Sequence, residues 1–310
     1  MNTVPRVSVL IPSYNQSKLL KEAIESVLSQ TFSDFELIIN DNASTDDTQT
    51  MVQQFLHDAR VRYFRNEVTI PMHENWNKCL EHPRASYIKY LCSDDKLRPR
   101  ALELMVAAMD ENPDVAIVSS GRQYFGEKDR LFILDWKGKY DGKETILNTL
   151  RISNWMASPS TVMCRKENFE HNKFRGYKWV TDWDMWIRHL GLGHYYGIPE
   201  VLMDERVHSG SATRNFSMNM IKLSEEYELF RNVRDNGYSI QFPGREEELE
   251  QLVKRKALEC SRYMYSRVPR LKKKKNRIAF LKMLAIVRKE KVLVKSLQVQ
   301  VEKRLLGKQV

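Results

Sequence analysis

The sequence VSVLIPSYN (residues 7–15) opens with a β-branched apolar run that ends at a proline followed by polar residues. Such a run is typical of a buried strand. Apolar residues then recur every three or four positions from Leu19 to Leu28, which predicts a helix with Ser17 as its N-cap. The run ELIIN (residues 36–40) predicts a second buried strand. This order of strand, helix and strand is typical of two parallel strands joined by a crossover helix.

The same alternation continues through the first half of the chain. It predicts an α/β fold with a parallel sheet covered by helices on both faces. Residues 121–154 carry weaker signals and predict loops with one or two short elements, and charged helices follow from about residue 216. The further predicted elements are helix 44–57, strand 61–64, helix 73–81, strand 87–92, helix 99–110, strand 115–119, strand 161–164 and helix 182–190.

Charge divides the chain into two parts. The net charge is +10, but the residues from Ser266 onward include 15 Lys or Arg and only two Glu, so the remainder is mildly acidic. We therefore predict an α/β domain over residues 1–215 and a basic helical extension over residues 216–310. A basic tail of this kind indicates an anionic surface as its partner.

The composition also predicts a compartment. No stretch of about 18 apolar residues occurs and the N-terminal apolar run does not resemble a signal peptide, so we expect no spanning helix. Scattered cysteines without a CxxC pair favour a reducing environment. These features predict a cytoplasmic protein. The cysteines are Cys79, Cys92, Cys164 and Cys260.

Polar residues gather where three predicted strands end, at residues 12–15, 41–46 and 93–95. Ligands of α/β sheets bind beyond the carboxyl ends of the strands, so we expect a site there. Asp94 and Asp95 are adjacent, and their like charges repel unless a cation neutralises them. Mn²⁺ and Mg²⁺ bind carboxylates and substrate phosphates, so the pair predicts a metal site for a diphosphate; a solvated turn is the alternative.

Two stretches together resemble a known family. They are VSVLIPSYNQSKLLKEAIESVLSQTFSDFELIINDNASTDDT (residues 7–48) and ENWNKCLEHPRASYIKYLCSDD (residues 74–95). In order and spacing they resemble family 2 of the inverting glycosyltransferases, over roughly residues 7–213. The resemblance implies the Rossmann-like GT-A fold and transfer of a hexosyl unit from a nucleoside-diphosphate sugar to a saccharide hydroxyl. It also implies a place in the synthesis of a cell-surface polysaccharide.

The resemblance assigns a nucleotide pocket to the first two strand ends. Pro12, Tyr14 and Asn15 match the motif that lines this pocket, and Asp41 and Asn42 match a pair of acids that contacts the base. The family often has an aspartate where this chain has Asn42. Because a carboxamide can donate hydrogen bonds as well as accept them, this departure leaves the identity of the nucleobase open. UDP- or dTDP-sugars are favoured as donors.

The third strand end matches the family's metal motif. Asp94 is assigned to the ribose or the metal and Asp95 to a bound Mn²⁺ or Mg²⁺, while Cys92 replaces a frequent acid. The segment Arg206–Ser211 resembles a late motif whose histidine lies near the diphosphate, so His208 is a second candidate ligand. A structural histidine is the alternative for His208.

A general base is expected at the start of the helix predicted over residues 182–190. Asp182 matches the catalytic aspartate of a Glu-Asp motif in which Thr181 replaces the glutamate. One carboxylate suffices to take the proton of the attacking hydroxyl. Asp184 is the competing candidate, and a helix cap is the structural alternative for Asp182.

The acceptor side is assigned to the segment before the predicted strand 161–164. Trp155 and Ser160 lie where the family places acceptor residues, and tryptophan rings can stack on sugars. Several further tryptophans follow at helical spacing, which is more often typical of a core.

The basic tail allows two interpretations. Residues 272–275 are four lysines, and they precede the apolar stretches 278–281 and 283–287. These stretches are too short to span a bilayer but could lie in the interface of an anionic membrane, where a lipid-linked saccharide would be found. The alternative is that they pack on the catalytic domain or on a second subunit of a homo-oligomer. Nucleic-acid binding by the tail is a further alternative, although no nucleic-acid partner is expected.

Two other functions are weighed against transfer. Synthesis of a nucleotide sugar requires a glycine-rich phosphate loop, and residues 12–15 contain no glycine. A catalytically degenerate sugar-binding or scaffold protein of the same fold is the remaining alternative, because of Cys92 and Thr181.

Overall fold

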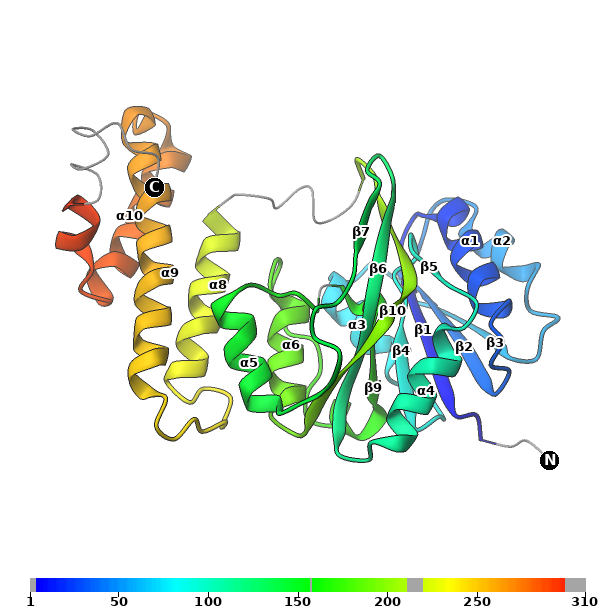
Figure 1. Cartoon of the computed structure of the whole chain (residues 1–310). Helices are drawn as coiled ribbons and strands as arrows, with labels where there is room; N and C mark the ends of the chain where they lie inside the picture. The colour runs from blue at the N-terminus through cyan, green and yellow to red at the C-terminus, as the bar shows by residue number, and fades with distance from the viewer. Residues whose placement is uncertain (1–3, 157, 211–219, 299–310) are drawn as a thin grey trace. The chain divides into compact units, whose positions relative to one another are not determined.

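A computed structural model describes residues 4–156, 158–210 and 220–298 of the 310-residue chain. In the part of the chain described, no helix combines the length and the apolar character needed to cross a membrane. Among the described residues, strands lie in the N-terminal two thirds of the chain and only helices follow them (Figure 1).

The chain forms two compact units. The first unit comprises Met1–Gly176 with Thr181–Ser211, and the second unit comprises Tyr177–Val180 with Ala212–Val310. The predicted boundary after residue 215 lies outside the described residues and stays a prediction. The sequence does not predict that Tyr177–Val180 group with the C-terminal helices.

The first unit contains a mixed sheet of ten strands (Figure 1). These are β1 (Val7–Ser13), β2 (Phe35–Asp41), β3 (Val61–Arg65), β4 (Tyr87–Tyr90), β5 (Lys96–Leu97), β6 (Val115–Gly126), β7 (Arg130–Phe132), β8 (Gly138–Tyr140), β9 (Val162–Arg165) and β10 (His194–Val207). The order is β3-β2-β1-β4-β9-β6-β10-β5, with β7 paired to β6 and β8 to β10. Strands β1 to β4 are parallel, as are β6 and β10, and β9 lies antiparallel between β4 and β6. The predicted α/β fold class is confirmed.

Helices cover both faces of this sheet. Val7, Val9 and Ile11 of β1 belong to one hydrophobic core together with residues of the helices that follow β1 and β5. On the opposite face Asn40 of β2 donates a hydrogen bond to Asn75 (Nδ2–Oδ1, 2.8 Å). Alternate residues of one strand therefore face different helices. The helices of this unit are α1 (Ser17–Leu28), α2 (Thr48–Gln53), α3 (Met72–Cys79), α4 (Ala101–Glu111), α5 (Gly142–Arg151) and α6 (Thr181–Leu190).

The predicted cap of the first helix is wrong. Ser17 is the first residue of α1 rather than its cap, and Gln16 at the cap position makes no side-chain hydrogen bond there. The Ser17 N–H instead donates to Asp46 Oδ2 (3.0 Å). A distant carboxylate thus satisfies a donor that a local cap usually satisfies. The helix predicted over residues 44–57 is also shorter, and α2 ends at Gln53.

Strand β10 and the outer half of β6 are not predicted from the sequence. The two strands pair in parallel, and their register shifts between Ile198 and Val201 and between Val201 and Met203. Pro199 lies inside this irregular segment. Bulges interrupt the alternation of side chains on which a strand prediction rests, so the pattern is hidden.

The second unit is helical. Its helices include α8 (Met220–Arg234), α9 (Glu246–Arg267) and α10 (Lys274–Lys289). The Glu225 carboxylate accepts the Trp179 N–H (2.7 Å), which ties the short segment Tyr177–Val180 to α8. Glu290, directly after α10, accepts hydrogen bonds from Tyr227 (2.6 Å) and Arg234 (2.7 Å). Buried ionic and polar contacts therefore join these helices.

Candidate active site

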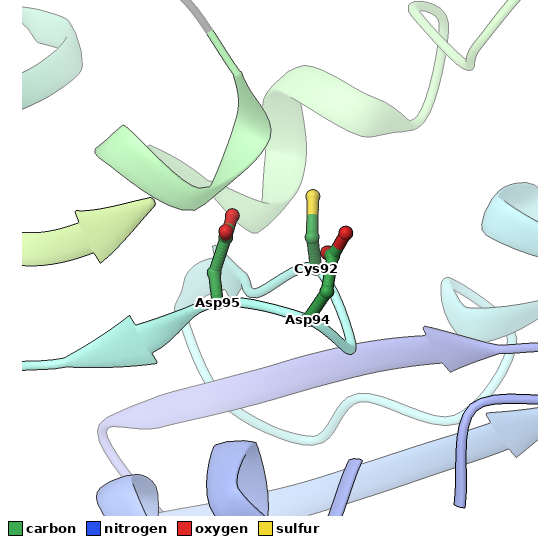
Figure 2. A group of neighbouring side chains, drawn as sticks. All are labelled: Cys92, Asp94 and Asp95. Carbon is green, nitrogen blue, oxygen red and sulfur yellow. The ribbon is translucent and has the colours of Figure 1, made fainter. Parts of the chain in front are cut away.

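The chain turns sharply after β4, at residues 92–95. One ligand atom from each of Cys92, Asp94 and Asp95 lies within 4.8 Å of the other two. Figure 2 shows the three side chains on the same side of the turn. The structure therefore groups the two predicted carboxylates and adds a thiol to them.

Residues from two distant segments hold this turn: Ser160, in the short 3-10 helix Pro159–Thr161 before β9, and Arg206 of β10. The Ser160 hydroxyl accepts the Cys92 N–H (2.9 Å) and donates to Asp95 Oδ2 (2.6 Å). From β10, the Arg206 N–H donates to Asp95 Oδ1 (2.9 Å), and its guanidinium Nε donates to the Asp94 carbonyl (3.0 Å). Each carboxylate oxygen of Asp95 thus has a donor and keeps a further lone pair for a cation.

The electrostatics of the turn favour a cation. Asp95 is 3% exposed, and burial raises its pKa well above the usual value; the charges of Asp94 and Glu205 raise it further. Burial also raises the pKa of the Cys92 thiol, with Asp95 and Asp94 adding to the effect. A divalent cation would relieve this repulsion between like charges. Carboxylate oxygens suit Mn²⁺ or Mg²⁺, whereas a protonated thiol is a poor ligand for either.

His208 lies beside this group. Its Nε2 is 3.0 Å from Asp94 Oδ2, and both side chains are partly exposed. An imidazole nitrogen can bind a transition metal such as Mn²⁺, so the described residues fit the predicted cofactor. Its role as a ligand stays a prediction.

Glu205 is a candidate site residue that the sequence does not predict. It lies on β10, and its Oε2 is 3.0 Å from Arg122 Nε on β6. Burial raises the pKa of Glu205, partly offset by Arg122, and the charge of Glu205 in turn raises the pKa of both Asp95 and Asp182. Glu205 therefore interacts electrostatically with both the candidate metal ligand Asp95 and the candidate base Asp182. It lies on a strand that the sequence does not predict. Only its position next to the Arg206–Ser211 motif could have drawn attention to it.

Asp182 and Asp184, in the first turn of α6, have opposite surroundings. Burial raises the pKa of Asp182 to about 7; hydrogen bonds from backbone N–H groups oppose this shift and the charge of Glu205 adds to it. Asp184 is fully buried, and its Oδ2 lies 2.7 Å from an Arg188 nitrogen. Arg175 lies 3.6 Å from its other oxygen. Asp184 is therefore neutralised within the protein, whereas Asp182 has the pKa of a base poised near neutral pH.

The first two strand ends meet in a shared loop network. Asn15 has a positive φ of 52° and follows Tyr14, whose side chain is half exposed. Its N–H donates to Ser44 Oγ (2.9 Å), and its Oδ1 accepts the Thr45 N–H (2.7 Å). Pro12 lies buried at the end of β1. Asn15 therefore joins the first motif to the second.

Asp41 and Asn42 are both engaged within the protein. Asp41 is fully buried, and its Oδ2 accepts the Tyr63 hydroxyl (2.7 Å) and lies 3.3 Å from Arg65 Nε. The Asn42 amide donates to the Ile70 carbonyl (2.8 Å) and accepts the Ile70 N–H (3.0 Å). A carboxylate could not donate to that carbonyl, which gives a structural reason for asparagine at this position. The nucleotide contacts of both residues stay predictions.

The two predicted acceptor residues differ in their contacts. Trp155 stacks on Trp136 (ring centroids 5.4 Å apart) and meets Tyr195 edge-on. Its indole Nε1 is buried with no hydrogen-bond partner among the described residues. Ser160 is fully buried and holds the Cys92–Asp95 turn, so the structure gives its hydroxyl a different contact from the predicted one. Acceptor binding by either residue stays a prediction.

Comparison with known families identifies the class of protein. The family model described as glycosyl transferase family 2 matches residues 8–172, more than half of the chain. The chain therefore belongs to glycosyl transferase family 2, and the predicted resemblance is confirmed.

Two of the relatives that match the chain in sequence are bacterial glycosyltransferases by name. It is 36% identical over 129 residues to EpsE of Bacillus subtilis, named as a glycosyltransferase, with 41% of this chain and 46% of EpsE covered. It is 34% identical over 110 residues to the GalNAc(5)-diNAcBac-PP-undecaprenol beta-1,3-glucosyltransferase of Campylobacter jejuni, with 35% and 36% covered. The chain thus spans less than half the length of both relatives.

Two solved structures share the fold. S. aureus TarS 1-349 in complex with UDP-GlcNAc has a TM-score of 0.70 at 16% identity, over 91% of this chain and 81% of that chain. The mannosyltransferase PcManGT from Pyrobaculum calidifontis, in complex with GDP-Man and Mn²⁺, has a TM-score of 0.58 at 15% identity, over 99% and 81%. At these identities the likeness shows the fold alone, and it agrees with the predicted GT-A fold.

Proposed function

We propose that this protein is a metal-dependent, inverting hexosyltransferase that uses a nucleoside-diphosphate sugar. The observation that carries this proposal is the buried acidic turn after β4, where two aspartates lie within reach of one ion and Asp95 is disfavoured as an anion without one. Asp182 supplies a separate carboxylate with a pKa of about 7. A metal site for a leaving diphosphate and a base for an incoming hydroxyl are the two groups that such transfer needs.

Asp95, Asp94 and His208 would hold the ion, Mn²⁺ or Mg²⁺. When bound, the ion supplies charge stabilisation to the leaving diphosphate, so that no protonating acid is needed. The Mn²⁺ in the solved structure of PcManGT supports this choice of cofactor.

Asp182 is the proposed general base. It takes the proton of the acceptor hydroxyl as the hydroxyl attacks the anomeric carbon from the face opposite the diphosphate, which inverts that centre. A carboxylate with a pKa near 7 is a stronger base than an ordinary aspartate and is still ionised to a useful extent at neutral pH.

The donor and acceptor assignments rest on the motif residues and on relatives. Pro12, Tyr14, Asn15, Asp41 and Asn42 would surround the nucleotide, a UDP- or dTDP-sugar. The UDP-GlcNAc bound to TarS supports a uridine nucleotide, and the GDP-Man bound to PcManGT shows that this fold also accepts guanosine.

The proposed acceptor is a saccharide or a lipid-linked saccharide, in polysaccharide synthesis in the cytoplasm. The name of the Campylobacter jejuni relative, which contains an undecaprenol-linked acceptor, supports this class. Trp155 is proposed to stack on the acceptor sugar. Ser160 is proposed to lie on the acceptor side as well, next to the turn that its hydroxyl holds through Cys92 and Asp95. An assembly of several copies is compatible with this function.

A thermal-shift series tests the proposal. UDP, dTDP and GDP are added with Mn²⁺ or with a chelator, because binding to the folded state raises stability, by about 2.7 kcal/mol at a hundredfold excess over Kd. The expected result is one nucleotide that raises the melting temperature only when Mn²⁺ is present. Stabilisation that is the same in chelator would contradict a metal-bridged diphosphate.

One observation favours a second candidate, a sugar-binding protein without turnover. Cys92 and Thr181 stand where the family pattern has acids, and the Cys92 thiol has a raised pKa. Measured transfer or donor hydrolysis under saturating Mn²⁺ distinguishes the two, since only an enzyme releases free nucleotide.

A further inference from the structure

Helix α10 divides its apolar residues between two faces. Ala279, Met283 and Val287 are buried, and Val287 packs with Ala257 of α9. One face of the helix is therefore part of the core of the second unit. This packing buries only some of the apolar residues between positions 278 and 287.

The opposite face carries an exposed apolar stripe. Ile278 is 43% exposed and Leu281 is 62% exposed, and Ala285 is exposed as well. Their spacing of three and four residues aligns them along one side of the helix. We call Ile278, Leu281 and Ala285 the outer stripe.

Basic side chains flank the outer stripe on both sides, and all of them are exposed. At 100° per residue, Arg277 and Arg288 fall on one side of the stripe and Lys275, Lys282 and Lys289 fall on the other. None of the basic residues between positions 272 and 291 forms a salt bridge within the described part of the chain. The nine are Lys272, Lys273, Lys274, Lys275, Arg277, Lys282, Arg288, Lys289 and Lys291.

The acid in this stretch does not offset that charge on the surface. Glu290 is 4% exposed, and its carboxylate accepts hydrogen bonds from Tyr227 and Arg234. The outer face of α10 is thus apolar along its centre and positive along its edges. This is the distribution found on helices that lie in the plane of an anionic membrane.

We propose that the outer face of α10 docks on an anionic lipid bilayer. The apolar side chains of the outer stripe enter the interfacial layer, and the flanking lysines and arginines contact lipid headgroups. This proposal is independent of the sugar transfer proposed above. Charge complementarity selects the occupant, because two copies of this face in a two-fold contact would bring like charges together. A nucleic acid would match the charge but not Ile278 and Leu281.

Sedimentation of the full-length chain with lipid vesicles tests the proposal. The vesicles are phosphatidylcholine with or without phosphatidylglycerol, at low and at moderate salt. We expect binding only with phosphatidylglycerol and weaker binding as salt rises. Equal binding to both vesicle types, or none to either, would overturn the proposal.

Two double variants separate the contributions of the stripe and of its flanks. Lys275→Gln with Lys282→Gln should weaken binding by about fivefold per lysine. Ile278→Ser with Leu281→Ser should weaken it by about tenfold or more, because exposed side chains that enter the interface are lost. Both pairs are exposed, so the melting temperature should not change.

Matched controls come from the first unit. Ile152 and Leu192 are 64% and 60% exposed, and Ile152→Ser with Leu192→Ser should leave vesicle binding unchanged. Lys128→Gln with Lys143→Gln is the control for charge. Equal losses in variant and control would mean nonspecific adsorption and would overturn the assignment to α10.

The mass of the chain in solution and its retention on DNA address the other occupants. If the wild-type protein did not bind anionic vesicles and Ile278→Ser with Leu281→Ser converted a dimer to a monomer, this face would be a subunit interface. Retention on DNA that depends on the lysines but not on the outer stripe, without vesicle binding, would make it a nucleic-acid surface. Either result contradicts membrane docking.

Discussion

Two buried carboxylates at opposite ends of the parallel strands, Glu36 and Asp95, have opposite surroundings. At the amino end of β2, Glu36 is 1% exposed and accepts hydrogen bonds from Ser8 (2.7 Å), Arg62 (2.9 Å) and the Arg84 side chain (2.9 Å). Burial alone would raise the pKa of Glu36, but these partners and the Arg84 backbone N–H outweigh it, and the net pKa is lowered. The fold itself neutralises this acid.

At the carboxyl end, Asp95 is buried as well but lacks such compensation. Its hydrogen-bond partners are the Ser160 hydroxyl and the Arg206 backbone N–H, while Asp94 and Glu205 add negative charge nearby. Its pKa is raised. The charge of Glu36 is therefore balanced within the protein, whereas that of Asp95 is not, and Asp95 lies at the end of the strands where a cation and a substrate would bind.

The largest expected effect comes from Asp95→Asn. This change should abolish transfer and the Mn²⁺-dependent part of nucleotide binding, because a carboxamide is neutral and binds a hard cation weakly. Folding should persist, since the neutral side chain replaces a carboxylate that burial disfavours. Steady-state transfer and a nucleotide titration with and without Mn²⁺ measure both effects. Full activity of wild-type protein in excess chelator would refute the assignment.

Asp182→Asn should have the next largest effect. We expect transfer to fall by roughly 10²-fold or more while donor binding stays nearly unchanged, since a positioned base is lost. Asp184→Asn is the matched comparison two residues away. It should instead lower stability by about 3 kcal/mol, because it removes the carboxylate that neutralises the buried Arg188 guanidinium. If Asp184→Asn abolished turnover in a stable protein and Asp182→Asn were active, the base would be assigned to the wrong carboxylate.

Glu36→Gln tests the opposite end of the sheet. We expect a loss of about 2 kcal/mol in the free energy of unfolding, because charged hydrogen bonds to Arg62 and Arg84 are weakened. Mn²⁺-dependent nucleotide binding should be unaffected at saturating ligand. Denaturant unfolding and the same nucleotide titration provide the two readouts. An unchanged free energy of unfolding would mean that the partners of Glu36 do not stabilise the fold as the comparison with Asp95 requires.

The smallest expected effect is a difference in pH dependence. The lowered pKa of Glu36 stabilises the fold above its ordinary pKa, and this stability is lost as pH falls through the lowered value. The raised pKa of Asp182 acts in the opposite sense: the fold is favoured below the ordinary pKa, and this contribution is lost as pH rises through about 7.

The free energy of unfolding of the metal-free wild-type protein should therefore fall by on the order of 1 kcal/mol between about pH 4 and pH 7. Asp182→Asn should not show this fall. Unfolding curves of the two proteins across this range measure the difference. In transfer assays of the wild type, the acidic limb should reflect the same ionisation near pH 7, and a limb that persists in the residual activity of Asp182→Asn would assign it to another group.

Local patterns in the sequence predict the parts of this protein whose residues are close along the chain. Strands β1, β2 and β4, the helix carrying Asp182 and the adjacent Asp94 and Asp95 all follow from short-range periodicity or from neighbouring charges. The family is also recognisable from two continuous stretches. Each of these features depends on side chains that are within one element or one turn of each other.

Tertiary structure alone decides which of these groups are free to act. Ser160 and Arg206 hold Asp95 from 65 and 111 positions away, and no local pattern connects them. The bulged strand β10, which brings Glu205 to the site, hides its alternation in the sequence. Asp182 and Asp184 look alike in sequence. They differ because Arg188 neutralises one of them in a buried pair, whereas burial raises the pKa of the other.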